Sequence, residues 1–121
     1  MLVVDDEADV RLLLRHALRR RRDVEVVGEA ADGNEAVELA ATLGPDVIVL
    51  DQMMPEMSGT DALPYLRQAA ASAYIVFHSS LSATALDKAL GTRDGADSYV
   101  PKGHTAELLA LIDRLRAGAR R

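Results

Sequence analysis

The chain has 121 residues, enough for one ordinary domain but not for two. Its formal net charge of -5 makes the domain as a whole a poor candidate for gripping nucleic acid, and the lack of cysteine excludes disulfides and thiolate metal sites. No apolar run approaches the roughly 20 residues that cross a bilayer, and nothing N-terminal looks like a signal peptide, so we expect a cytoplasmic protein without a membrane partner.

Short runs rich in β-branched residues recur along the chain and predict strands. These runs are Leu2–Val4, Val24–Val27, Val47–Leu50, Tyr74–Phe77 and Ser98–Val100. The first, third and fourth are continuously apolar, which is typical of strands that are buried on both faces of a parallel sheet. The sequence therefore favours a parallel sheet that is covered by helices.

Segments with helical spacing lie between these runs. Their apolar stripes fall within residues 10–18, 36–43, 63–71, 85–90 and 108–115. Asp32 and Glu35 form a plausible capping box at the start of the second stripe, and Pro64 must cost the third helix a backbone hydrogen bond. Strand and helix thus alternate five times, which predicts a doubly wound α/β fold with a five-stranded parallel sheet and helices on both faces.

Chemically useful side chains follow four of the predicted strands. They are Asp5 and Asp6 after the first run, Asp51 after the third, Ser79 and Ser80 after the fourth, and Lys102 after the fifth. Ligand chemistry in such sheets sits at the carboxyl ends of the strands, so we expect these residues to converge. Three carboxylates in one crevice repel each other unless a cation lies among them, and an open oxygen-rich site suits Mg²⁺. A hydroxyl and a lysine beside the metal would complete a site for phosphoryl transfer.

Each of these residues has an ordinary structural interpretation when it is taken alone. An aspartate after a strand is often a helix cap or a turn former, the serines would usually be turn residues, and Lys102 would be a solvated lysine. His78, which extends the fourth strand by one residue beyond its apolar run, is interpreted as a core histidine with one hydrogen bond. However, all four strand ends carry the side chains that a phosphoryl-transfer site requires, and they do so in the right order. This favours the functional interpretation of these residues taken together.

Three segments resemble the hallmark motifs of bacterial response regulator receiver domains. They are Val3–Glu7, Asp51–Gly59 and Gly95–Lys102. The D-x-x-M-P-x-M-x-G match is long and specific, and the resemblance covers essentially the whole chain. It implies a flavodoxin-like sheet with strand order 2-1-3-4-5, a receiver domain over residues 1–116, and a linker or tail over residues 117–121.

The segment Val27–Gly33 is similar to the NarL/LuxR-type subfamily of these receivers. That subfamily usually carries a C-terminal helix-turn-helix DNA-binding domain, which this chain does not contain. The resemblance therefore implies a phosphorylation-activated switch that controls transcription through an absent output domain. A stand-alone receiver that acts by protein–protein interaction is the alternative.

The resemblance also implies the role of each site residue. Asp51 is the phosphoacceptor and takes its phosphoryl group from a sensor histidine kinase. Mg²⁺ is held by the carboxylates and by one backbone carbonyl, from Asp5, Asp6, Asp51 and Met53. Lys102 pairs with the phosphoryl oxygens, and homodimerisation on phosphorylation is left open.

A hydroxyl at the end of the fourth strand binds the phosphoryl group, and Tyr99 is the aromatic switch that follows it inward. Ser79 directly follows the segment Ile75–His78 and is our first choice for this hydroxyl, whereas counting back from Lys102 favours Ser80.

Two other classes of protein share parts of this pattern. A small Mg²⁺-dependent phosphatase of the haloacid dehalogenase type would look like D-x-D, but Met53 stands in the place of the second aspartate. A flavodoxin-like cofactor binder would need a phosphate-cradling loop after the first strand, where Asp5 and Asp6 would repel a phosphate. We therefore expect a regulatory domain that catalyses only its own phosphorylation and dephosphorylation.

Overall fold

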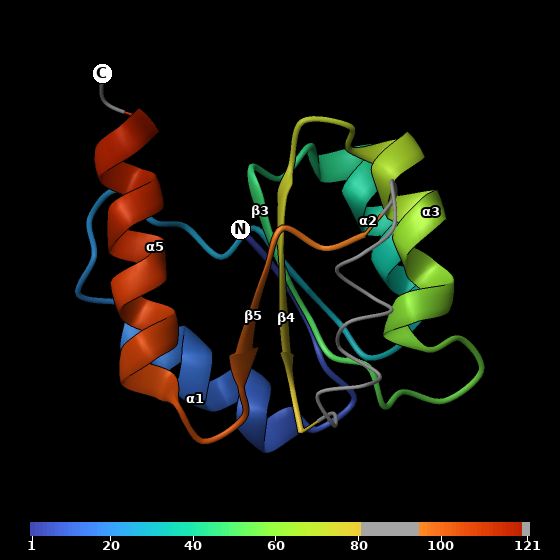
Figure 1. Cartoon of the computed structure of the whole chain (residues 1–121), viewed down its shortest axis with the longest axis horizontal. Coiled ribbons are helices and arrows are strands. Elements are labelled where there is room, and N and C mark those ends of the chain that lie inside the picture. Colours follow the sequence, from blue (N-terminus) through green and yellow to red (C-terminus); the bar gives the residue numbers. More distant parts are fainter. Residues whose placement is uncertain (81–94, 120–121) are drawn as a thin grey trace.

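A five-stranded parallel sheet forms the centre of the molecule. The computed structural model describes residues 1–80 and 95–119, and the strand order is β2-β1-β3-β4-β5, as predicted. The strands are β1 (Leu2–Val4), β2 (Gly28–Ala30), β3 (Val47–Leu50), β4 (Tyr74–Ser79) and β5 (Ser98–Pro101). All four described pairings are parallel, so the carboxyl ends of the strands meet at one edge (Figure 1).

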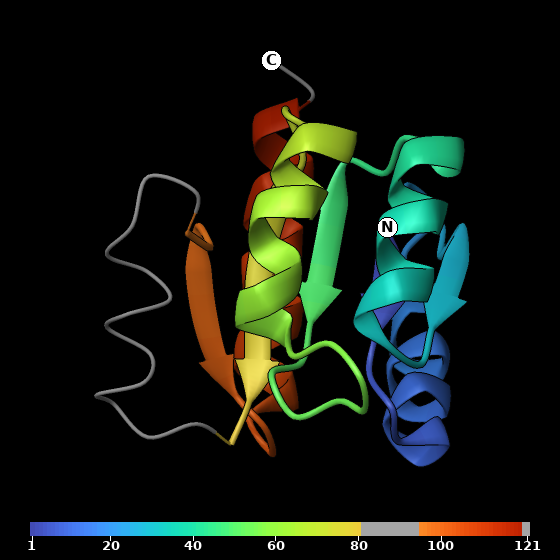
Figure 2. The same ribbon diagram turned by 90° about the vertical axis from the view of Figure 1, so that its right-hand side faces the viewer.

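Four described helices cover the two faces of this sheet. They are α1 (Ala8–Leu18), α2 (Gly33–Leu43), α3 (Gly59–Ala69) and α5 (Thr105–Ala119). Figure 2 looks at the sheet from the side of α2 and α3, with the strands behind these helices and α5 behind the strands. The predicted fourth helix, over residues 85–90, lies outside the described residues. Because α5 continues through Ala119, the expected tail over residues 117–121 starts within a helix.

Local sequence signals explain where α2 and α3 begin and end. The Asp32 side chain accepts a hydrogen bond from the Glu35 amide at 2.8 Å, and the Ser58 hydroxyl accepts one from the Asp61 amide at 3.2 Å. Gly44 ends α2 in the left-handed conformation with φ 56°. Pro64 lies inside α3, as the spacing predicted, so this helix forgoes one backbone hydrogen bond.

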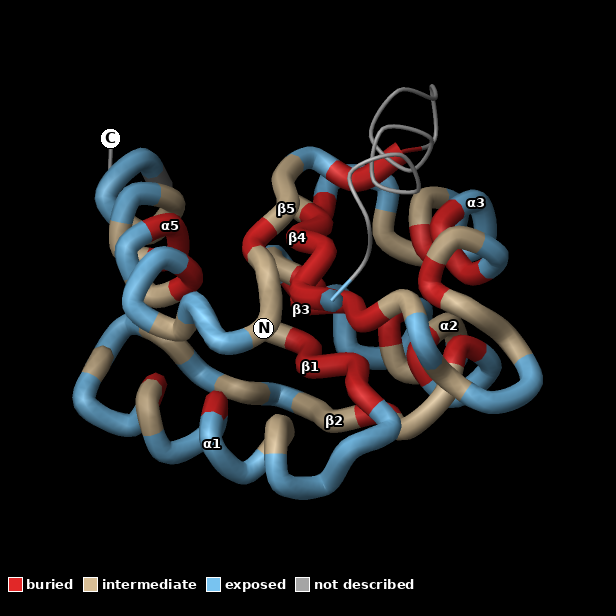
Figure 3. Tube along the Cα trace, turned by 60° about the horizontal axis from the view of Figure 1, so that its bottom comes forward, coloured by how far each residue is buried: buried red, intermediate tan, exposed pale blue. Residues whose placement is uncertain are grey.

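Alternate strand residues point to two separate apolar layers. The layer under α2 and α3 takes its strand side chains from Leu2, Val4, Ile48, Leu50, Ile75 and Phe77. The layer under α1 and α5 takes Val3, Val49, Val76 and Val100. Figure 3 shows the buried residues following the central strands through the molecule. Since side chains alternate along a strand, a residue's position fixes the layer that it joins.

The second strand lies further along the chain than we predicted. The apolar run Val24–Val27 is not a strand, and β2 is formed by Gly28–Ala30. The pairing register is the reason, because Leu2, the first residue of β1, lies beside Gly28, so the paired part of the second strand starts at Gly28. Two contacts still join Met1 to the run, since the Val27 amide donates to the Met1 carbonyl at 2.9 Å and the Met1 amino group donates to the Glu25 carbonyl at 2.8 Å.

No helix among residues 1–80 and 95–119 is long and apolar enough to cross a membrane.

Candidate functional site

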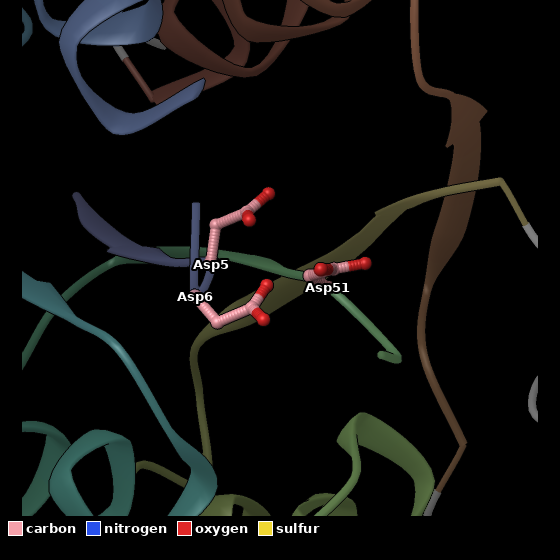
Figure 4. Close-up of side chains that lie close together, drawn as sticks. All are labelled: Asp5, Asp6 and Asp51. Carbon is pink, nitrogen blue, oxygen red and sulfur yellow. The ribbon is translucent and has the colours of Figure 1, made fainter. Parts of the chain in front are cut away.

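Three carboxylates converge at the carboxyl edge of the sheet. Asp5 and Asp6 directly follow β1, and Asp51 directly follows β3, which pairs with β1. One oxygen of each lies within 4.8 Å of the others, and Figure 4 shows the three side chains around a common space. Asp5 and Asp51 are buried, with 2% and 1% of their surface exposed, whereas Asp6 is open to solvent. The expected acidic cluster is therefore present.

Lys102 brings a positive charge from the end of β5 into this cluster. Its ammonium lies 3.1 Å from Asp51 Oδ2, 3.2 Å from Asp5 Oδ2 and 3.2 Å from Glu7 Oε1. Burial opposes the charge, but the hydrogen bond to Asp51 and the negative charges of Asp51 and Asp5 outweigh it and raise the pKa of Lys102. The lysine is thus held as a cation against the carboxylates.

Backbone groups hold Asp5 and Asp51 in place. The Asp5 amide donates to the Ala30 carbonyl at 3.0 Å, and Asp5 Oδ1 accepts from the Glu7 amide at 2.9 Å. Burial raises the pKa of the Asp5 carboxyl, and the charge of Asp51 acts in the same direction, while the Glu7 amide and Lys102 oppose the shift. Asp51 Oδ1 accepts from the Gln52 amide at 2.8 Å. The site therefore keeps two buried carboxylates close together at some electrostatic cost.

The loop after Asp51 folds back on the start of α3. The Gln52 side chain donates to Thr60 Oγ1 at 2.8 Å and accepts from the Thr60 amide at 2.6 Å. Gly59 lies so close that a Cβ there would meet the Asp51 carbonyl oxygen at 2.4 Å. A glycine is needed at this position because the two backbones touch. The Met53 side chain is 67% exposed, and the metal-binding role of its backbone carbonyl stays a prediction.

The alternation of side chains separates the two serines at the end of β4. Asp5, Asp51 and Lys102 each stand two positions after a valine of the α1 and α5 layer, namely Val3, Val49 and Val100. Val76 belongs to the same layer, so alternation along β4 puts His78 on the side of the acidic cluster and Ser79 on the opposite side with Phe77; continued one residue past the end of the strand, it would put Ser80 on the side of the cluster.

Contacts at Ser79 agree with this assignment. The Ser79 hydroxyl is fully buried and has no hydrogen-bond partner among the described residues, whereas Ser80 is exposed. Tyr99 packs against the α2 and α3 layer, and its hydroxyl donates to the Ser79 carbonyl at 3.1 Å. The structure therefore brings Asp5, Asp6, Asp51 and Lys102 together, and does not turn the Ser79 side chain toward them.

His78 is a neighbour of the site that the sequence did not identify. It is 4% exposed, and neither ring nitrogen has a hydrogen-bond partner among the described residues, so the single bond we expected is not found there. Burial lowers the pKa of His78, the charge of Lys102 adds to this effect, and Asp51 opposes it. Its position two residues after Val76 was the signal that could have placed it beside the acidic cluster.

The donor set fits a hard divalent cation. Carboxylate oxygens from three residues within 4.8 Å are the ligands that Mg²⁺ prefers, and the exposed side of Asp6 leaves room for the waters that this ion retains. A carboxylate flanked by an ammonium and a cation site can act as a nucleophile toward phosphorus. The geometry therefore supports phosphoryl transfer to a buried aspartate.

Comparisons with known proteins point to one family. The family model described as "Response regulator receiver domain" matches residues 1–113. The nitrate/nitrite response regulator NarL of Escherichia coli K12 is 36% identical over 119 residues, which cover 98% of this chain and 55% of that protein. A protein-glutamate methylesterase/protein-glutamine glutaminase of Rhodospirillum centenum is 38% identical over 117 residues, or 96% of this chain and 30% of the relative.

A solved structure agrees with these matches. The signal receiver domain of the NarL-type regulator from Mycobacterium tuberculosis superposes with a TM-score of 0.85 at 30% identity, over 97% of this chain and 94% of that one. The chain thus spans about a third to a half of the length of the two full-length relatives described above.

Proposed function

The chain belongs to the response regulator receiver domain family, and on this premise we propose that Asp51 is the phosphoacceptor of a phosphorylation-activated switch. One observation carries the proposal: the Asp51 carboxylate is 1% exposed, yet it lies 3.1 Å from the Lys102 ammonium and within 4.8 Å of oxygens of Asp5 and Asp6. Such a group is costly for folding, and a reaction at this carboxylate explains its presence.

The transfer is a displacement at phosphorus. A carboxylate oxygen of Asp51 attacks the phosphorus of a phosphohistidine on a sensor histidine kinase, the P–N bond breaks, and the electron pair leaves with the imidazole. Lys102 then exchanges an aspartate oxygen for a phosphoryl oxygen, so its charge remains compensated. Asp5, Asp6, Asp51 and the Met53 carbonyl would hold Mg²⁺, which supplies charge neutralisation when it is bound.

The hydroxyl that binds the phosphoryl group is assigned to Ser80 in this proposal, in place of Ser79. The alternation along β4 supports Ser80, since the pattern, continued one residue past the strand, puts this side chain on the side of Asp5, Asp51 and Lys102. Tyr99 is the proposed switch residue, because its hydroxyl is bonded to the Ser79 carbonyl, one residue before Ser80. Movement of Ser80 toward a phosphoryl group would therefore disturb the Tyr99 contact.

The proposed setting is that of a cytoplasmic two-component system. The partner is a sensor histidine kinase, and phosphorylation controls an output in the rest of the protein, with residues 1–116 as the receiver. Transcription is the proposed output because of the similarity to NarL, whereas the methylesterase relatives are enzymes of another kind. The domain itself is proposed to bind no nucleic acid or membrane and to act on no other substrate, with homodimerisation as a consequence of phosphorylation.

The test is the mass of the intact protein after incubation with Mg²⁺ and a small acyl-phosphate donor. We expect one added phosphoryl group in the natural chain and none in Asp51→Asn, which keeps the shape of the side chain but not its nucleophilic charge. Chelation of the metal before the donor is added should abolish the addition. Equal phosphorylation of Asp51→Asn would overturn the assignment of the phosphoacceptor.

A further inference from the structure

Arg11 makes a contact with the acidic site that the proposed mechanism does not use. It lies on α1, and its Nη1 donates a hydrogen bond of 2.6 Å to the backbone carbonyl of Asp5. The side chain is 21% exposed, so the bond is partly shielded from water. Arg11 thus touches the segment that carries two of the three clustered carboxylates, through its backbone.

Arg11 bonds to the backbone carbonyl of Asp5 and not to its carboxylate. The carbonyl of Asp5 belongs to the peptide unit that joins Asp5 to Asp6, and a peptide unit is planar. A donor that fixes this oxygen fixes the orientation of the whole plane, and with it the directions in which the two side chains leave the backbone. The other bonds of Asp5 do not hold this peptide unit, because the Asp5 amide donates to the Ala30 carbonyl and the Asp5 carboxylate accepts from the Glu7 amide and from Lys102.

Glu29 holds the other end of the guanidinium. Its carboxylate lies 3.5 Å from Arg11 Nε and 2.8 Å from Arg15 Nη1, and it stands on β2 beside Val3 of β1. Arg11 therefore connects β2, α1 and the peptide unit between Asp5 and Asp6. A planar guanidinium with donors in fixed directions suits this task better than a flexible ammonium.

Arg11 differs from Lys102 in what it bonds. Lys102 lies against the carboxylates of Asp5 and Asp51, where it occupies oxygens that a metal would also use. Within the described residues, the Arg11 side chain bonds to the Asp5 carbonyl and to Glu29 instead. Arg11 can therefore orient the ligands and leave their carboxylate oxygens available.

We infer that Arg11 is a positioning residue that sets the affinity of the Asp5–Asp6–Asp51 cluster for Mg²⁺ by fixing the peptide unit between Asp5 and Asp6. The inference rests on the proposed function in that Mg²⁺ is the ion of this site. Groups that orient metal ligands from behind typically change metal affinity by about 10-fold or more when they are removed. Arg11 takes that part here, acting through a backbone carbonyl.

The test is a titration of the full chain with Mg²⁺ alone, followed by the backbone amide NMR signals of Asp6, Glu7 and Gln52. We expect the dissociation constant to rise about 10-fold in Arg11→Ala. Arg15→Ala is the matched control, because Arg15 shares the Glu29 partner and the helix but does not contact Asp5 in the described contacts. It should change the constant by about twofold at most, as expected for one exposed charge.

Two further variants separate orientation from loss of charge or of folding. Arg11→Lys keeps the charge and one donor for the Asp5 carbonyl, so it should recover part of the lost affinity. Glu29→Gln leaves Arg11 in the chain but weakens its anchor, and we expect a smaller loss than in Arg11→Ala. In metal-free Arg11→Ala the Glu7 amide signal should also move, because this amide bonds to Asp5 Oδ1. Thermal unfolding of each variant checks that the fold is kept.

Equal Mg²⁺ affinity in the natural chain and in Arg11→Ala would overturn the inference and leave Asp51 as the phosphoacceptor. An equal loss in Arg11→Ala and Arg15→Ala would also overturn it, since charge alone would then be the cause. A natural chain that does not bind Mg²⁺ would contradict both proposals. Weakened binding in Arg11→Ala without phosphorylation of Asp51 would support Arg11 and contradict the proposed function.

Discussion

The two faces of the sheet are built from the same kind of apolar strand residues but end differently at the carboxyl edge. On the α2 and α3 side, Leu50 and Phe77 are fully buried and the last position is Ser79, whose hydroxyl is buried among the described residues without a partner. On the α1 and α5 side, the valines lead to Asp5, Asp51 and Lys102. One face thus stays apolar, and the other changes into a charged site.

The difference shows that alternate positions along a strand face different surroundings. One set of side chains leads to the charged site, and the other set joins the apolar layer under α2 and α3. A shift of one residue moves a side chain from the charged site to the apolar layer under α2 and α3, which we call the dry layer. The dry layer also supports the site, because α3 starts at Gly59 directly against the backbone of Asp51. The apolar face therefore offsets the cost of two carboxylates buried side by side on the other face.

The largest expected effect comes from removing the positive charge of the site. In metal-free buffer, Lys102→Ala should lower the free energy of unfolding by about 3 kcal/mol, because Asp5 and Asp51 would lose their buried countercharge. Denaturant unfolding with a chelator present measures this. Arg114→Ala, which removes an exposed cation from α5, is the control. Adding Asp51→Asn to Lys102→Ala should restore much of the lost stability. A loss in Lys102→Ala no larger than that in Arg114→Ala would show that Lys102 is not the countercharge of the buried carboxylates.

A smaller effect is expected where the dry face touches the site. A Cβ at Gly59 would lie 2.4 Å from the Asp51 carbonyl oxygen and 2.8 Å from Phe77 Cε1, so Gly59→Ala must shift backbone. We expect a cost of about 2 kcal/mol in unfolding and slower phosphorylation of Asp51. Gly118→Ala, whose added Cβ would meet no other part of the described fold within 4 Å, should instead stabilise α5 by about 0.5 kcal/mol. Equal behaviour of the two variants would show that the close approach is unimportant.

The two serines test the alternation itself. Ser80→Ala should reduce the population of the switched conformation in phosphorylated protein about 10-fold relative to the resting one, since one charge-assisted hydrogen bond of about 1.4 kcal/mol is lost. Ser79→Ala should leave this population unchanged, because its hydroxyl lies in the dry layer. NMR signals of the Tyr99 ring before and after phosphorylation report the two conformations. The reverse pattern would restore Ser79 as the phosphoryl-binding residue.

The smallest effect concerns His78, the buried neutral group on the charged face. The pKa of His78 is lowered in the folded state. Near and below the ordinary histidine pKa of about 6.5, the unfolded state therefore binds more protons than the folded state. As a result, the free energy of unfolding falls as the pH drops through that region. His78→Leu should remove this slope. At neutral pH it should stabilise the fold by about 1 kcal/mol, because two unbonded nitrogens are no longer buried. The measurement is the free energy of unfolding at several pH values, with His16→Leu on α1 as the control. A pH slope in His78→Leu equal to that of the natural chain would contradict this role of His78.

The sequence was sufficient where a local pattern carries the information. The parallel sheet and its strand order followed from continuous apolar runs and the family resemblance, and the convergence of Asp5, Asp51 and Lys102 followed from the rule that parallel strands end at one edge. The cap at Asp32 followed from local spacing as well. These features depend on neighbours along the chain or on topology alone.

The features that were missed depend on register between distant segments. The run Val24–Val27 has the residues of a strand, but the pairing of Leu2 with Gly28 puts the strand further along. The choice between Ser79 and Ser80 requires knowing which face Val76 occupies, and His78 beside the site follows only from that knowledge. The bond from Arg11 to the Asp5 carbonyl involves a backbone group, which leaves no mark in the sequence.

The most direct test of the central claim is chemical location of the phosphoryl group. Borohydride reduction of an aspartyl phosphate converts that aspartate to homoserine, which peptide mass spectrometry can assign to a position. After treatment with Mg²⁺ and a small acyl-phosphate donor, we expect homoserine at position 51 and unchanged aspartate at positions 5 and 6. Homoserine at either of those positions, or none anywhere in phosphorylated protein, would contradict the claim that Asp51 is the reacting group.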